Sequence, residues 1–77
     1  MIIDPRQMTF PQWTAQMTLL LDKFGPTMKL QDETMWREWA INTLYLTGIS
    51  TAAINPFQFE NATDWAVRFS QELEPLI

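Results

Sequence analysis

The segment Glu38-Trp39-Ala40-Ile41 decides the fold of this chain, because it recurs twice more at equal spacing. Its counterparts are Gln12-Trp13-Thr14-Ala15 and Asp64-Trp65-Ala66-Val67, so the tryptophans stand at positions 13, 39 and 65, an interval of 26 residues. Each tryptophan follows a Gln, Glu or Asp, and an apolar residue stands two positions after it. An interval of this length fits one helix and one connection. The spacing predicts one helical unit used three times, with the three indoles meeting at a common centre.

Signals for helix ends divide the chain into three helices. Thr9 and Asn61 are suitable N-caps, Asp32 favours a helix start, and Gly25 and Gly48 are typical stops. The predicted fold is therefore all-α, a single small helical domain over residues 1–77. Its three helices are expected at about 10–24, 33–47 and 62–74, with an ordered connection over 48–61.

The core is predicted from the apolar stripe on each helix. Its expected members are Trp13, Trp39, Trp65, Phe10, Met17, Leu20, Phe24, Phe69 and Leu73. Phe57 and Phe59 of the connection are expected to fill the same interior. The chain has no Cys and no His, which leaves neither a disulfide nor a conventional zinc site for stability. A buried aromatic side chain removes roughly 150–250 Å² from water, so aromatic bulk has to provide that stability.

The reverse sides of the helices are also apolar, which a lone three-helix bundle does not need. Ala15, Ile41 and Val67 point about 200° away from the tryptophans, and Leu19 and Tyr45 extend the same face. One interpretation is that the N-terminal arm or the connection covers this face. The other is that the back of the second helix docks on another protein or on a second copy of the chain.

Further apolar residues lie outside the expected core. Trp36 is about 60° from Trp39 on the second helix, which fits either the edge of the core or a partly exposed contact. The apolar ends of the chain, Met1-Ile2-Ile3 and Leu76-Ile77, are unusual because termini commonly fray; this suggests that neighbours hold them. The candidate partner-binding residues are Trp36, Ile41, Tyr45, Ile2, Ile3 and Ile77.

Charge argues against binding to a nucleic-acid backbone, and the short apolar stretches argue against a membrane span. Nine acidic and five basic residues give a net charge of −4, and the Lys and Arg residues stand singly rather than in clusters. No stretch approaches the ~20 apolar residues of a membrane span, and the N-terminus lacks the pattern of a signal peptide. A mimic of DNA is conceivable for an acidic protein, but Asp32-Glu33 is the one adjacent acidic pair.

The residue types needed for common catalysis are missing. Without His or Cys the chain has neither the commonest general base nor a thiol nucleophile. Glu38 and Asp64 are not paired catalytic carboxylates, because Gln12 takes the matching place in the first copy. The two glycines cannot form a phosphate-binding loop. We therefore expect no catalytic residue, cofactor or metal; a subunit of an enzyme would need catalytic groups from its partner.

The chain resembles small, Trp-rich proteins encoded among the structural genes of tailed bacteriophages. The resemblance rests on Phe10-Pro11-Gln12-Trp13 and on Ile54-Asn55-Pro56-Phe57-Gln58-Phe59, followed by Thr63-Asp64-Trp65-Ala66. The second stretch is similar to an Asn-Pro-aromatic and then Asp-Trp-Ala pattern in such proteins, and covers roughly the last third of the chain. No functional residue is carried over from it.

The resemblance implies a non-enzymatic structural protein, a minor virion component of the head, neck or tail assembly. Such a protein is made in the host cytoplasm, is present in several copies and binds other virion proteins, with homo-oligomers among the options. The alternative is a small acidic phage regulator or inhibitor that binds a host protein, including a DNA mimic.

Overall fold

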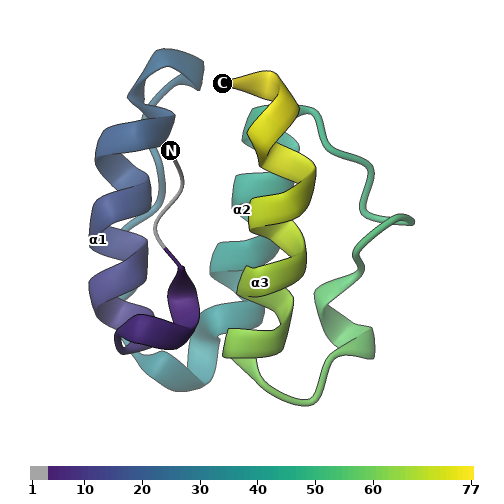
Figure 1. Ribbon diagram of the computed structural model, residues 1–77. Helices are drawn as coiled ribbons and strands as arrows, with labels where there is room; N and C mark the ends of the chain where they lie inside the picture. The colour runs from purple at the N-terminus through teal and green to yellow at the C-terminus, as the bar shows by residue number, and fades with distance from the viewer. Residues whose placement is uncertain (1–3) are drawn as a thin grey trace.

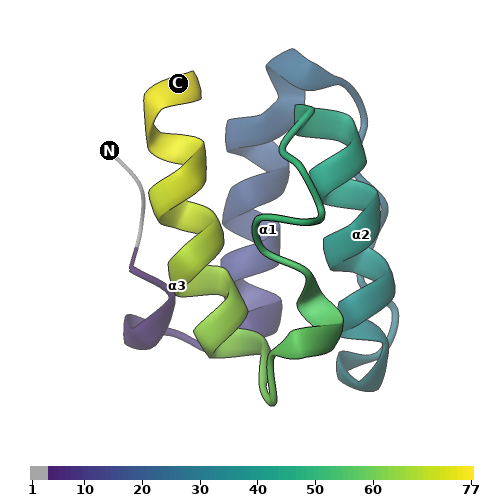
Figure 2. The same cartoon turned by 90° about the vertical axis from the view of Figure 1, so that its right-hand side faces the viewer.

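The computed structural model describes residues 4–77, and this part of the chain is all-α, as the sequence predicts. Its three α-helices are α1 (Phe10–Leu20), α2 (Trp36–Thr47) and α3 (Ala62–Leu73), which lie side by side as a bundle (Figures 1 and 2). Five short 3-10 helices flank them: η1 (Pro5–Gln7), η2 (Leu21–Phe24), η3 (Glu33–Met35), η4 (Pro56–Gln58) and η5 (Glu74–Leu76).

The first helix begins and ends where its sequence signals predict. The Gln12 N–H donates to Thr9 Oγ1 over 3.3 Å while the Thr9 N–H donates to Gln12 Oε1 over 3.0 Å, which completes a capping box. After Leu20 the chain tightens into η2, so the predicted helix over 10–24 consists of α1 followed by a 3-10 turn. Gly25 ends it at a φ of 131°, a backbone conformation that other residues rarely adopt.

The second helix starts later as an α-helix than its acidic cap suggests. Asp32 accepts a hydrogen bond from the Thr34 N–H over 2.9 Å, but it caps the 3-10 helix η3, and α2 begins at Trp36. This backbone hydrogen bond lowers the pKa of the Asp32 carboxyl below its ordinary value of 3.8. Gly48, with a φ of 76°, ends α2 in the left-handed conformation.

The third helix is capped by the Asn61 side chain, which makes two hydrogen bonds to Asp64. Asn61 Oδ1 accepts from the Asp64 N–H over 2.9 Å, and Asn61 Nδ2 donates to the Asp64 carboxylate over 3.1 Å. After Leu73 the chain passes into η5, which contains Pro75. Lys23 Nζ donates to the Leu76 carbonyl over 3.3 Å and so joins η5 to η2 at one end of the bundle.

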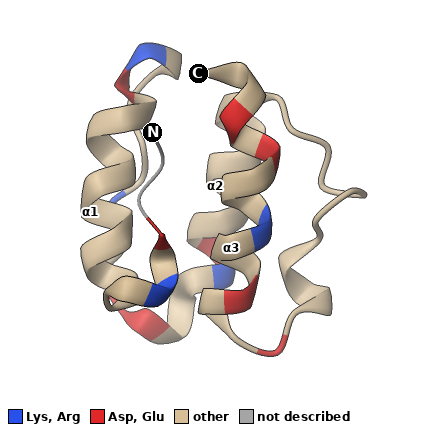
Figure 3. Cartoon of the chain, viewed as in Figure 1, with Lys and Arg blue, Asp and Glu red and all other residues tan. Residues whose placement is uncertain are grey.

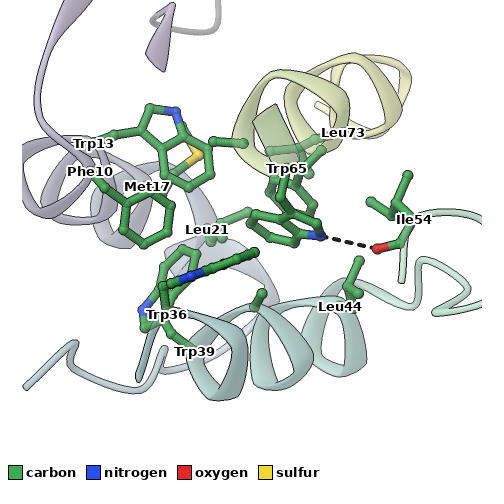
Figure 4. Packing of buried hydrophobic residues seen from close by; sticks show 13 residues of the cluster. Phe10, Trp13, Met17, Leu21, Trp36, Trp39, Leu44, Ile54, Trp65 and Leu73 are labelled. Carbon is green, nitrogen blue, oxygen red and sulfur yellow. Dashed lines mark hydrogen bonds between the residues drawn. The ribbon is translucent and has the colours of Figure 1, made fainter. Parts of the chain in front are cut away.

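The three repeated tryptophans meet at the centre of the bundle, each fully buried (Figure 4). Their ring centroids are 5.7 Å apart for Trp13–Trp39, 6.2 Å for Trp13–Trp65 and 6.3 Å for Trp39–Trp65. All three pairs are edge-to-face, an arrangement that the aromatic quadrupole favours. The Trp65 indole N–H donates to the Ile54 carbonyl over 3.0 Å and thereby attaches the connection to the core.

The rest of the core agrees with the expected apolar stripes except at a few positions. Phe10, Met17, Phe69 and Leu73 are buried. Leu20 and Phe24 are only partly buried, and Leu21 takes the central place because η2 turns it inward. Within the connection, Phe59 is partly buried but Phe57 is 65% exposed, so the expectation that Phe57 fills the interior is wrong. Ile54 and Pro56 fill it instead.

Candidate protein-binding surface

An apolar depression lies over the outer side of α2, opposite its tryptophan side. It is lined by six residues, which we call the α2 outer face: Met28, Glu38, Ile41, Asn42, Tyr45 and Phe57. Four of them come from α2 at positions i, i+3, i+4 and i+7, which helical periodicity places on one side. Tyr45 is 88% exposed, Phe57 65% and Met28 40%, while Ile41 is half-buried. Large apolar side chains therefore gather on the surface of a bundle whose core is complete without them.

Phe57 points outward from an ordered turn whose neighbouring residue Pro56 is buried. Asn55 Oδ1 accepts from the Phe57 N–H over 3.0 Å and starts η4, which directs Pro56 into the core. The Arg37 guanidinium then fixes this turn to α2, because Nε donates to the Pro56 carbonyl (3.2 Å) and Nη2 to the Phe59 carbonyl (2.8 Å). The exposure of Phe57 is thus a consequence of ordered hydrogen bonding.

Met28 reaches the α2 outer face from the segment between η2 and η3. This segment runs alongside α1 and α2 (Figure 2) and is anchored at two points. Thr27 Oγ1 donates to Thr18 Oγ1 over 3.1 Å, and Leu30 packs partly buried against the core. With Thr27 and Leu30 directed towards the bundle, Met28 remains at the surface.

Electrostatically, the α2 outer face is almost neutral. Glu38 is its one charged residue, whereas the acidic and basic residues of the described chain are interspersed along the helices rather than gathered on one side (Figure 3). The nearby Arg37 is occupied by its carbonyl hydrogen bonds and lies 4.5 Å over the Trp36 ring. The α2 outer face is therefore suited to a largely apolar contact that includes one carboxylate, that of Glu38.

The structure places the sequence-predicted partner-binding residues in three different settings. Ile41 and Tyr45 lie together on the α2 outer face. Ile77, 41% exposed, follows η5 and does not line that face. Ile2 and Ile3 lie outside the described residues.

Trp36 requires a correction, because it is only 7% exposed and belongs to the core. Its ring lies 6.2 Å from Phe10 and 6.4 Å from Trp65, between centroids, and Arg37 covers it. It is therefore not an exposed contact. The interpretation of Trp36 as an edge of the core fits this position.

The apolar back faces of the other helices have different neighbours. Next to α3, the 3-10 helix η1 lies beside Val67, with Pro5 buried and Asp4 and Arg6 paired at 3.0 Å. The hydrogen bond from the Arg6 side chain lowers the pKa of Asp4. On α1, by contrast, Leu19 is 75% exposed and stands apart from the α2 outer face. The N-terminal arm therefore covers part of the back of α3, whereas on the back of α2 the connection brings Phe57 beside the half-buried Ile41 and leaves Tyr45 88% exposed.

Sequence reasoning missed Met28 and Phe57 as surface residues. For Phe57 a signal exists, because Asn55-Pro56 is a typical start of a 3-10 turn. At about three residues per turn, Pro56 and Phe59 share one side of that turn and Phe57 points to another. For Met28 the surrounding sequence has no periodic pattern that indicates whether its side chain is buried or exposed.

The buried hydroxyl groups of the described residues donate to helix backbone carbonyls. Thr14, Thr43 and Ser70 donate over 2.8 Å to carbonyls three or four residues earlier. In residues 4–77, no three Asp or Glu side chains are grouped so that they hold a metal ion. None of the helices described is long and apolar enough to cross a membrane.

Comparisons with protein-family models, with curated proteins and with solved structures each gave no match to this chain. Its function is therefore inferred from its own residues.

Proposed function

We propose that this protein is a non-enzymatic structural protein that binds other protein subunits through the α2 outer face. One observation carries the proposal: Tyr45 and Phe57 are 88% and 65% exposed on one apolar depression of a bundle with a closed core. Contiguous exposed apolar surface of this kind marks interaction sites in folded proteins. Aromatic residues at the centre of such a patch are the usual anchors of protein interfaces.

The order of the α2 outer face supports binding by a preformed surface. Phe57 is held by the hydrogen bonds of Arg37 to η4, and Tyr45 and Ile41 project from a regular helix. Little conformational entropy is then lost when a partner covers these side chains. A partner with a shallow apolar ridge or groove of its own fits this surface.

The setting that we propose for this binding is the virion of a tailed bacteriophage. The support is the resemblance of the segments around Trp13, 54–59 and Trp65 to small Trp-rich proteins encoded among phage structural genes. In this proposal the chain is made in the host cytoplasm and enters the head, neck or tail assembly as a minor component.

The test combines particle composition with two matched variants. Tyr45→Ala and Leu19→Ala each remove an exposed apolar side chain, 88% and 75% exposed respectively, but only Tyr45 lies on the α2 outer face. Mass spectrometry of purified particles should detect the wild-type chain and the Leu19→Ala variant, with a strong loss of Tyr45→Ala. Absence of the wild-type chain from particles, together with recovery of one soluble host protein bound to it, would support the regulator or inhibitor instead.

A further inference from the structure

The α2 residues of the α2 outer face have a spacing that is the same in both directions along the helix. Glu38, Ile41, Asn42 and Tyr45 occupy positions i, i+3, i+4 and i+7, so reading the helix backwards gives the same spacing. At about 100° per residue, Ile41 and Asn42 lie on opposite sides of the line that joins Glu38 to Tyr45. This spacing suits a two-fold interface between two identical antiparallel helices, in which residue i of one copy contacts residue j of the other and residue j contacts residue i.

Reversal also brings together side chains of matching chemistry. When two α2 helices face each other antiparallel, with the two-fold axis crossing between residues 41 and 42, Ile41 meets Ile41 and Asn42 meets Asn42 of the second copy. Ile41 pairs are apolar, and a carboxamide both donates and accepts hydrogen bonds. Glu38 then stands opposite the Tyr45 of the second copy, where a phenol hydroxyl donates to a carboxylate.

We propose that the partner of the α2 outer face is a second copy of this chain, bound with the two α2 helices antiparallel. Charge selects the antiparallel direction. In a parallel pair the two Glu38 carboxylates face each other, and such like-charge contacts are unfavourable. In the antiparallel pair they are seven residues apart along the helix, about 10 Å, and each gains a hydroxyl donor.

The exposed area suits a reversible homodimer. A standard interface buries about 800 Å² on each partner, whereas the whole molecule exposes 4840 Å². Taking 150–250 Å² for a whole aromatic side chain, the exposed fractions of Tyr45 and Phe57 provide roughly 230–380 Å². Met28, 40% exposed, and Met35, 47% exposed beside it, enlarge this apolar area. The total stays below the standard of about 800 Å² on each partner, in the range of weak and transient contacts.

This inference rests on the proposed function, because it uses the same surface and names its occupant. Experiments can contradict the homodimer and the proposed virion role independently of each other. If the chain does not pair with itself but Tyr45→Ala still loses its place in particles, the surface binds a different virion protein. If the chain pairs with itself and is absent from particles, the proposed virion role is wrong and the self-contact remains.

Site-directed disulfide formation tests both the contact and its direction, and the chain is suited to it because it has no cysteine. Disulfides form readily when two Cα atoms are within about 7 Å. Asn42→Cys is expected to convert the 9.1 kDa chain into a covalent dimer of twice that mass under mild oxidation. Glu38→Cys and Tyr45→Cys, each alone, are expected to remain largely monomeric, whereas an equimolar mixture of the two should form the mixed dimer.

Gln16→Cys, an exposed position on α1, measures the rate of disulfide formation by random collision. Sedimentation equilibrium of the chain without cysteine gives an independent readout, in which Tyr45→Ala shifts the protein to monomer and Leu19→Ala does not. The proposal is overturned if the chain stays at 9.1 kDa up to about 1 mM and Asn42→Cys reacts no faster than Gln16→Cys. Faster dimerisation of Glu38→Cys alone than of Asn42→Cys would overturn the antiparallel direction.

Discussion

At the scale of single residues, two aromatic side chains on the same helix have opposite roles. Trp39 is fully buried and contacts the other two repeated tryptophans, whereas Tyr45 is 88% exposed on the opposite side of α2. Trp36 shows that helical angle alone does not decide such roles. It lies only about 60° from Trp39, and its burial depends on Arg37, which covers its ring at 4.5 Å. Arg37 in turn is positioned by the carbonyls of Pro56 in η4 and of Phe59 directly after it, which the local sequence of α2 does not reveal.

Substitution by alanine should separate these two roles. Trp39→Ala leaves a large cavity at the centre of the bundle and is expected to cost roughly 3–5 kcal/mol in the free energy of unfolding. Domains of this size have a total of only about 5–10 kcal/mol. Tyr45→Ala should change that free energy by less than about 0.5 kcal/mol in dilute protein. Urea unfolding followed by circular dichroism measures both, and an equal loss for the two variants would mean that Tyr45 belongs to the core.

At the scale of helices and connections, local sequence predicts what local contacts determine. Thr9, Asn61 and Gly48 mark helix ends, and the structure has the corresponding caps because each depends on hydrogen bonds within a few residues. Local sequence does not predict that Leu21, rather than Leu20, is fully buried in the core. This burial follows from the change from α-helix to η2, which shifts the side chains relative to a 3.6-residue period.

In the candidate binding surface, too, local sequence predicts the residues on a helix but not those of the connection. Ile41 and Tyr45 were identifiable because an excess apolar face on a helix is visible in sequence. From the sequence alone, Phe57 is expected to fill the interior together with Phe59, but it is 65% exposed. Its actual direction depends on the buried Pro56 and on two hydrogen bonds from Arg37, 19 and 22 residues away in the chain.

Removal of Arg37 should therefore loosen η4 and the binding surface together. Arg37→Ala deletes hydrogen bonds to the Pro56 and Phe59 carbonyls and uncovers Trp36, and we expect a loss of about 1.5–3 kcal/mol. Amide hydrogen exchange over 54–59 should accelerate more than exchange in α1. The control is Arg68→Ala, whose pair with Glu72 at 3.2 Å is solvent-exposed and should contribute under 1 kcal/mol. Unchanged exchange over 54–59 in Arg37→Ala would contradict this role.

At the scale of the whole molecule, the bundle is complete without a partner. Its radius of gyration is 11.0 Å, close to the roughly 11.5 Å expected for a folded chain of this length. Its exposed surface of 4840 Å² is likewise near the roughly 4900 Å² expected for a monomeric protein of this mass. Folding therefore does not depend on covering the α2 outer face. A contact made there is reversible association between folded molecules, and conditions that change the charge interaction between them should change its strength.

Salt dependence tests which force holds two copies together. Each copy carries a net charge of −4, so two copies repel each other, and the contact itself is uncharged apart from Glu38. The range of that repulsion falls from about 30 Å at 0.01 M salt to about 8 Å at 0.15 M. Self-association measured by sedimentation equilibrium should therefore strengthen as salt increases over this range. Glu38→Gln removes one negative charge from each copy, and so two from the interface, while retaining an acceptor for Tyr45, and should reduce the salt dependence. A contact that weakens with added salt would instead be held by opposite charges, which the α2 outer face does not supply to an identical partner.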